Sequence, residues 1–254
     1  MPPSTVADVL RSLQPEPGRP RLTWYGPDGE RVELSGAVLE NWVTKTTNLL
    51  VEELDAAPGS RVVLDLPPHW RTVLWALATW RAGACVVAAG PDDAAGAGAD
   101  AVVTDRPGRW GTAAPVVAVA LPALARRFDG ELPPRAVDAA AAVMTYGDAL
   151  GWVPDPDPAA EALVAEGVRV AHRDLLAWAG APAGPGARTL VTAPDVPARA
   201  QAAVAFVRST LAVLGGAGSV VALSAAVAGE LADDPARRAR VLSSERVEVD
   251  GPVG

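Results

Sequence analysis

Residues 61–89, RVVLDLPPHWRTVLWALATWRAGACVVAA, decide the fold class of this chain. The apolar run at 61–66 is typical of a short buried strand, and the two prolines that follow end it. Trp70–Arg81 is long and apolar enough for a buried helix, and 84–89 is again a short apolar strand. Strand, helix and strand in this order form a βαβ unit with parallel strands and a right-handed crossover. The segment predicts an α/β fold with doubly wound, mostly parallel sheets flanked by helices.

The residues before this unit predict a hairpin and a helix. Leu22–Leu34 is β-rich on both sides of the turn sequence Gly26-Pro27-Asp28-Gly29. Ser35 is a good N-cap, and apolar residues recur at helical spacing through 36–54. We therefore expect an antiparallel strand pair that leads directly into a long helix.

The residues after it resume the alternation of strands and helices. We expect short strands at 101–104, 116–119, 188–192 and 219–223, and helical segments at 121–128, 172–179 and 198–214. Between them lies an acidic, proline-broken stretch. The sequence thus predicts a first α/β lobe at 1–130, a linker-like irregular region at 131–166, and a second α/β lobe at 167–254 packed on the first.

Composition excludes several classes of function. Half of the 254 residues are hydrophobic, which is enough for a sizeable core. The net charge of −8 argues against a nucleic-acid partner, which needs clustered cations. Cys85, the single cysteine, lies in an apolar run, so we expect a buried thiol and a reducing, cytoplasmic location. The N-terminus lacks a signal-peptide pattern and no window has the ~18 apolar residues of a membrane span, so we expect no membrane partner.

Five pieces of the chain resemble the adenylate-forming (AMP-binding, acyl-CoA synthetase-like) enzyme superfamily. None is specific alone, but they follow in the family's order and cover nearly the whole chain. The pieces are Leu22–Tyr25, Pro58–Val62, Leu64–Pro68, Trp80–Ala84 and Gly167–Leu176. The resemblance implies the fold of the N-terminal subdomains of acyl-CoA synthetases.

The chain departs from that family where ATP would bind. There, the passage before the Gly167 piece is a Ser/Thr/Gly-rich loop ending in Pro-Lys-Gly that holds the ATP phosphates. Here 161–167 is EALVAEG, without lysine or hydroxyl groups and with two carboxylates that would repel a triphosphate. The sequence also stops before the family's adenine and ribose motifs and its catalytic lysine. We therefore expect no catalytic residue, and ATP or AMP as cofactor only through family resemblance.

Four residues are candidates for the wall of a ligand site: Tyr146, Asp148, His172 and Arg173. The sequence Tyr146-Gly147-Asp148 is similar to the family's ribose motif, although it comes far too early in the chain. The family counterpart of His172 lies near the active-site wall, whereas a single His before a helix more often caps or packs. A packing role is also the expectation for His69. A substitute phosphate site, if nucleotide binds, would lie around 145–148 and His172.

Other chemistries lack their patterns. No spacing of His and Cys predicts a metal site. Gly218-Ser219-Val220 lacks the second glycine of a nucleophile elbow, and Gly96-Ala97-Gly98 precedes a strand rather than following one. The acidic pairs Asp92-Asp93 and Asp233-Asp234 are expected to be solvated or to cap helices.

Three functions remain open. The favoured one is a noncatalytic homologue that binds a protein partner, a second copy, or a small acyl or nucleotide-like ligand. The alternative is one part of a split ATP-dependent acyl-adenylate-forming ligase, whose second polypeptide supplies the missing nucleotide site. An unrelated nucleotide-dependent enzyme on a Rossmann-like sheet ranks last, because fold alone supports it.

Overall fold

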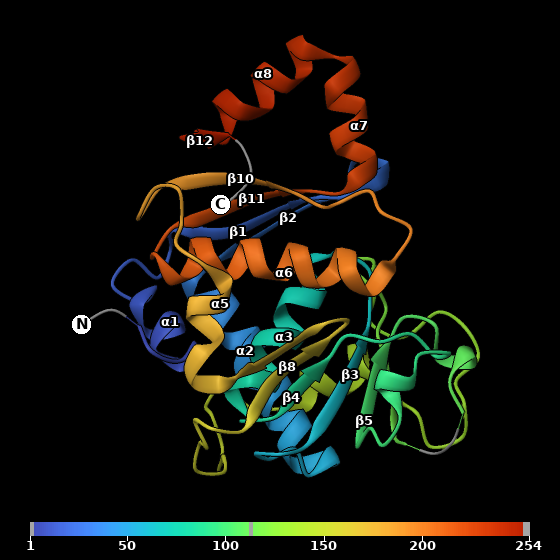
Figure 1. Ribbon diagram of the computed structural model, residues 1–254. Helices are drawn as coiled ribbons and strands as arrows, with labels where there is room; N and C mark the ends of the chain where they lie inside the picture. Colours follow the sequence, from blue (N-terminus) through green and yellow to red (C-terminus); the bar gives the residue numbers. More distant parts are fainter. Residues whose placement is uncertain (1–2, 112–113, 251–254) are drawn as a thin grey trace.

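The computed structural model describes residues 3–111 and 114–250, which form two mixed, mostly parallel sheets flanked by helices (Figure 1). The predicted fold class is confirmed. Figure 1 shows α6 lying between the two sheets, with α7 and α8 on the opposite face of the upper sheet. The α-helices are α1 (Val6–Ser12), α2 (Gly36–Leu54), α3 (Trp70–Arg81), α4 (Ala139–Ala142), α5 (Leu175–Ala179), α6 (Arg199–Gly215), α7 (Ala225–Asp233) and α8 (Pro235–Ser244). The 3₁₀ turns are η1 (Pro27–Gly29), η2 (Ala94–Gly96), η3 (Pro107–Arg109), η4 (Val143–Thr145) and η5 (His172–Asp174).

The seven-stranded sheet has the order β7-β6-β5-β3-β4-β8-β9. All neighbouring strands are parallel except β8 and β9, which form an antiparallel hairpin. The predicted βαβ unit is present as β3, α3 and β4. The strands are β3 (Arg61–Asp65), β4 (Cys85–Val87), β5 (Ala101–Thr104), β6 (Val116–Ala118), β7 (Val137–Asp138), β8 (Glu161–Ala165) and β9 (Val168–Ala171).

The five-stranded sheet has the order β12-β10-β11-β1-β2. The hairpin of β1 and β2 is antiparallel, as predicted, and the other neighbours are parallel. Helix α6 packs against strands of both sheets, so one apolar core extends between them. The strands are β1 (Pro20–Tyr25), β2 (Arg31–Ser35), β10 (Arg188–Thr192), β11 (Ser219–Leu223) and β12 (Val249–Asp250).

Side-chain caps fix where the two central helices begin. The hydroxyl of Ser35 accepts a hydrogen bond from the Val38 N–H at the start of α2. The Nδ1 atom of His69 accepts one from the Arg71 N–H at the start of α3. Each bond satisfies an N–H group that has no partner within the helix. The predicted N-cap at Ser35 and the structural role of His69 are confirmed.

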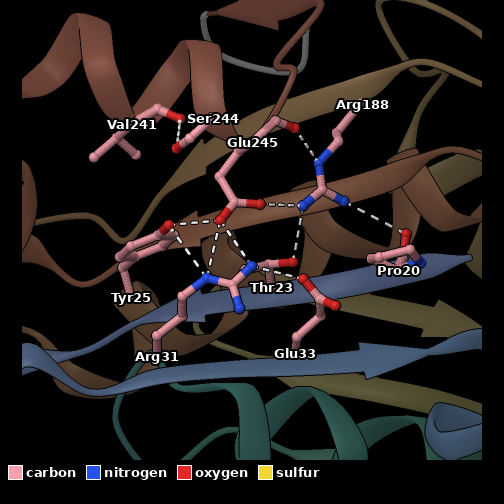
Figure 2. Close-up of polar contacts among 9 residues, drawn as sticks. All are labelled: Pro20, Thr23, Tyr25, Arg31, Glu33, Arg188, Val241, Ser244 and Glu245. Carbon is pink, nitrogen blue, oxygen red and sulfur yellow. Dashed lines mark hydrogen bonds and ion pairs between the residues drawn. The ribbon is translucent and has the colours of Figure 1, made fainter.

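The C-terminal helices α7 and α8 cover the five-stranded sheet through apolar and ionic contacts. Glu245, at the end of α8, has a side chain only 7% exposed. Its carboxylate accepts hydrogen bonds from the Tyr25 hydroxyl and from Arg31 and Arg188, as Figure 2 shows. This Glu245 network ties α8 to β1, β2 and β10.

The structure differs from the sequence pattern in two segments. The prediction of a helix at 121–128 is wrong: the segment forms turns, and the carbonyls of Leu121, Pro122 and Ala123 accept hydrogen bonds from the buried Arg71, which ties it to α3. The region 131–166 is not irregular throughout, since it contains β7, α4 and β8. Pairing with β4 supplies the partner that makes 161–165 a strand.

Each sheet contains strands from both of the predicted lobes. β1 and β2 lie within the predicted first lobe, yet they pair with β11 of the predicted second lobe. β9 begins after residue 167 and lies in the sheet built on β3. The division at 130 and 167 stays a prediction, and residues 1–2, 112–113 and 251–254 lie outside the described residues.

Candidate functional site

A cleft of about 800 Å³ lies at the carboxyl ends of β3, β4 and β8. These strands are parallel, so their carboxyl ends share one edge of the sheet. The first turns of α6 form the opposite wall. Open α/β sheets bind their ligands at this edge. The charged lining residues are Asp65, Asp92, Asp93, Arg106, Arg109, Glu166, Arg199 and Arg208.

Asp65 is a buried carboxylate at the end of β3, with a side chain 3% exposed. One carboxylate oxygen accepts a hydrogen bond from Arg106 Nη2 at 2.5 Å. The other accepts hydrogen bonds from the Thr104 hydroxyl at 2.9 Å and from the Trp110 indole N–H at 3.0 Å. All of these donors come from β5 or the segment after it. They leave Asp65 fully engaged, so we assign it a structural role in shaping the cleft.

Arg199, the first residue of α6, connects that helix to the sheet. It forms an ion pair with Asp105, and its Nε atom lies 3.7 Å from Asp65 Oδ1. Burial raises the pKa of Asp105 and lowers that of Arg199, as expected for charges removed from water. Together with Arg106, these residues form what we call the Asp65 cluster, in which two carboxylates balance two guanidinium groups.

One face of α6 lines the cleft. Gln201, Val204, Ala205 and Arg208 are spaced by three or four residues, so they lie along a single stripe of the helix. Arg208 donates from Nε to the Trp178 carbonyl at 2.9 Å, and its guanidinium lies 5.7 Å from the centre of the Trp178 ring. The far end of the stripe therefore presents a positioned cation beside an aromatic ring.

The rim of the cleft carries two further polar contacts. Arg109 Nη2 lies 3.3 Å from Asp92 Oδ2, and both side chains are exposed. Gln201 donates to a Glu166 carboxylate oxygen at 2.5 Å, which links α6 to the tip of the β8–β9 hairpin. Asp93 accepts a hydrogen bond from the Gly90 N–H, so its role is in the local turn.

The β8–β9 hairpin has a loop of only two residues, Glu166 and Gly167. Ala165 and Val168 are paired directly across it, and Gly167 has a positive φ of 69°. This hairpin stands where the family resemblance places the phosphate loop. Of the two carboxylates expected there, Glu166 lines the cleft, whereas Glu161 pairs with Arg169 at 2.6 Å at the other end of β8.

A small apolar pocket of about 20 Å³ adjoins the cleft. Ala88, Trp178 and Val204 line both spaces, so the two are separated by little more than these side chains. The remaining pocket residues are apolar apart from one threonine: Leu64, Thr72, Ala76, Trp80, Val86, Leu163, Ala203 and Val207. The cleft thus combines a charged wall with an apolar corner.

Tyr146 and Asp148, two of the predicted site residues, lie against α2. Lys45 donates to the Tyr146 carbonyl at 2.6 Å and pairs with Asp148 at 2.8 Å. The Tyr146 hydroxyl donates to Glu53, and burial together with this carboxylate raises the pKa of Tyr146 to about 12. Neither residue lines the cleft. Their role in ligand binding stays a prediction.

His172 and Arg173 lie where β9 leads into α5. The Nε2 atom of His172 is 3.0 Å from the Gly83 carbonyl, and burial lowers the pKa of this imidazole. Arg173 is exposed and pairs with its neighbour Asp174 at 3.4 Å. Neither lines the cleft, so the predicted wall residues are not brought together there.

The cleft residues that sequence reasoning missed are spread over six separate segments. No motif joins Asp65, Arg106, Arg199 and Arg208 along the chain. The usable signal was the rule that ligands bind at the carboxyl ends of parallel strands, which would have selected Asp65 at the end of the first strand of the βαβ unit.

Three further properties bear on the site. Cys85 is a buried free thiol, as predicted, and burial raises its pKa to about 11. Among residues 3–111 and 114–250, no group of three or more His, Cys, Asp or Glu side chains could hold a metal ion. None of the helices described in the structure is both long and apolar enough to span a bilayer.

The sequence has a relative in Mycobacterium tuberculosis. This protein, described as a "TIGR03089 family protein", is 36% identical over 189 residues, which are 70% of this chain and 74% of that protein. No protein-family model matches the chain.

Solved structures of adenylate-forming enzymes share the fold. An acyl-CoA synthetase from Brucella canis matches with a TM-score of 0.65 at 18% identity, over 86% of this chain and 43% of that one. Coronafacic acid ligase from Pectobacterium brasiliense matches with a TM-score of 0.65 at 10% identity, over 90% and 47%. The N-terminal subdomain of NpsA from Klebsiella oxytoca, in complex with 3-hydroxybenzoyl-AMSN, matches with a TM-score of 0.62 at 16% identity, over 91% and 58%. The chain spans 43–58% of the length of these proteins, and at these identities the likeness shows the fold.

Proposed function

The chain belongs to the TIGR03089 protein family, and from this premise we propose that it is a noncatalytic protein that binds a small organic ligand in the cleft. The observation that carries the proposal is the two-residue loop of the β8–β9 hairpin. In the adenylate-forming enzymes that the chain resembles, the phosphate loop stands at this position. Here the two strands are joined by two residues instead of that loop. The fold would thus retain a ligand cleft without the means to hold ATP for adenylation.

The chemistry of the hairpin supports this reading. A phosphate loop needs several backbone N–H groups that converge on the anion and a nearby lysine or arginine. The two loop residues are too few to surround a phosphate, and the charged one is a carboxylate. Glu166 lines the cleft and is held by Gln201, so a triphosphate entering here would meet a fixed negative charge.

The cleft itself supports binding without catalysis. Its volume of about 800 Å³ falls within the range of small-molecule sites. The carboxylates that line it accept hydrogen bonds or ion pairs from guanidinium, hydroxyl, indole, amide or backbone donors, which supports a role in shaping the cleft. An arrangement of this kind can orient a ligand by charge and shape.

The test combines an activity assay with a binding assay on the purified chain. We expect no exchange of radiolabelled pyrophosphate into ATP with any of a panel of aliphatic and aromatic carboxylic acids. We also expect at least one acid, or its CoA thioester, to raise the melting temperature, because ligands that bind the native state stabilise it by mass action. Acid-dependent exchange would overturn the proposal. A panel-wide absence of thermal shift, confirmed by calorimetry, would remove the ligand-binding part.

A split ligase is the second candidate, and exposed apolar side chains favour it. Met144, Leu150 and Trp152 lie within nine residues of one another, and their exposed fractions are 60%, 39% and 77%. Exposed apolar surface of this kind marks contact sites between proteins. We would add cell extract of the source organism to the exchange assay. The split-ligase reading requires exchange that depends on this chain and is lost with Trp152→Ser, whereas exchange independent of the chain counts against it.

A further inference from the structure

We propose that the ligand of the cleft is an organic anion with a short apolar group, and that Arg208 binds its negative charge. This inference rests on the proposed ligand-binding function and adds the class of ligand and its anchoring residue. The anion would be a carboxylate or a phosphate ester, since both present oxygens that match a guanidinium fork.

Arg208 differs from the other guanidinium groups of the cleft in having no carboxylate partner. Arg106 pairs with Asp65 at 2.5 Å, Arg199 pairs with Asp105, and Arg109 pairs with Asp92 at 3.3 Å. Within the part of the chain that the structure describes, no carboxylate oxygen lies within 4.0 Å of Arg208. Arg208 is also exposed to solvent, so its guanidinium is open to an anionic ligand that enters the cleft.

Arg208 is also positioned before any ligand arrives. Its Nε atom is used by the Trp178 carbonyl at 2.9 Å, and the Trp178 ring lies 5.7 Å from the guanidinium. These two contacts restrain the side chain, and among residues 3–111 and 114–250 no acceptor bonds either terminal nitrogen. A restrained guanidinium loses less conformational entropy on binding an anion, which favours affinity.

The acids of the cleft do not compete for this charge. Asp65 accepts hydrogen bonds from three side chains, Asp92 pairs with Arg109, and Glu166 accepts from Gln201. Asp93 accepts from the Gly90 N–H. None of these contacts involves Arg208, so its guanidinium is not taken up by the acids that line the cleft.

Trp178 sets the nature of the rest of the ligand. It lines both the cleft and the apolar pocket, so an anion on Arg208 places its next atoms against the indole ring and Val204. The pocket beyond them measures about 20 Å³, room for about one water-sized group. This pocket cannot admit a long acyl chain, so we expect a flat or short apolar group that stays in the cleft and packs against the Trp178 ring, such as a phenyl ring.

Titration of the full chain with matched probes tests the inference. Benzoate, phenyl phosphate and inorganic phosphate are the anions, and benzamide is the neutral isostere of benzoate. Binding would be followed by calorimetry and by the indole N–H resonances of the tryptophans, with the Trp178 resonance assigned from Trp178→Phe. We expect benzoate or phenyl phosphate to shift the Trp178 resonance and benzamide not to. A stronger response to phenyl phosphate would identify the ligand class as a phosphate ester. A stronger response to benzoate would identify it as a carboxylate.

Variants of the arginine separate charge from folding. Arg208→Gln should weaken binding of the anion about tenfold or more, the size of a lost charge-assisted hydrogen bond. Arg208→Lys should recover part of the loss, because a point charge replaces the fork. Arg240→Gln is the matched control, since Arg240 is exposed on α8, on the other side of the five-stranded sheet from α6. It should bind like the unchanged protein.

Each failure has a distinct meaning. If benzamide binds as well as benzoate, or if Arg208→Gln binds the anions unchanged, the inference is wrong while the ligand-binding proposal stands. If none of the four probes shifts any tryptophan resonance at about 10 mM, a concentration that reveals even weak binding, the inference is rejected. The panel of acids and thioesters then decides the proposed function separately.

Discussion

Asp65 is a buried carboxylate between two guanidinium groups, and its substitution tests what the Asp65 cluster contributes to stability. Asp65→Asn keeps the shape of the side chain but leaves Arg106 and Arg199 with one carboxylate, Asp105, between them. We expect the free energy of unfolding to fall by about 2–3 kcal/mol, less than for a fully buried pair because Arg106 is partly exposed. Urea denaturation measures the change.

The matched control is the exposed ion pair at the rim of the same cleft. Asp92→Asn makes the same chemical change, but Asp92 and Arg109 have side chains 90% and 58% exposed. Exposed pairs are screened by water, so stability should change by less than about 0.5 kcal/mol. If the two substitutions lowered the free energy of unfolding equally, burial would not explain the contribution of the Asp65 cluster to stability.

At the scale of elements, the Glu245 network predicts that α8 is held to the sheet in a pH-dependent way. Burial alone would raise the pKa of Glu245, but hydrogen bonds from Tyr25, Arg188 and Arg31 outweigh it and hold that pKa below its ordinary value. A carboxylate with a lowered pKa stabilises the fold fully above its unfolded pKa and loses that effect as the pH falls through the folded one. The contribution should be complete above about pH 5.5 and decline below about pH 4.5.

Hydrogen exchange of residues 225–250, followed by mass spectrometry, measures this contribution. Glu245→Gln should raise exchange in α7 and α8 near neutral pH and show little further loss on acidification, relative to the unchanged chain at each pH. Glu230→Gln is the control, because Glu230 pairs with Arg237 at 2.8 Å and both side chains are exposed to solvent. Acid sensitivity that persists in Glu245→Gln would assign the effect to another group.

Elements with strong local signals were predictable, and those that depend on distant partners were not. The ends of β3 and α3 agree with the sequence because proline, a histidine cap and glycine mark them. The segment 121–128 has helix-forming residues, yet it forms turns that are held to α3 by hydrogen bonds from Arg71, about fifty residues earlier in the chain. The candidate site was harder still to predict from the sequence, because its charged side chains come together only after the strands have paired in the sheet.

At the scale of the whole molecule, β1 connects the two ends of the chain. Trp24 of β1 is buried, and its ring lies 5.8 Å from that of Phe206 on α6 and 5.0 Å from that of His69. Arg188 of β10 donates to the Thr23 hydroxyl at 3.0 Å, which reinforces the link through β11. The first strands are therefore completed by residues more than 160 positions later.

This interlocking predicts that residues 1–130 do not fold alone, whereas a first lobe that is an independent folding unit would do so. Without β11 and α6, the fragment would expose Trp24 and one edge of β1, so we expect no cooperative unfolding transition and solvent-exposed tryptophan fluorescence. Fragment 131–254 should behave likewise, and mixing the two should restore a blue-shifted emission and one transition. The intact chain is the control, and its fluorescence and circular dichroism should change together. A cooperative transition of 1–130 on its own would show that the first lobe is an independent folding unit, and the two-lobe division would then replace the single interlocked body.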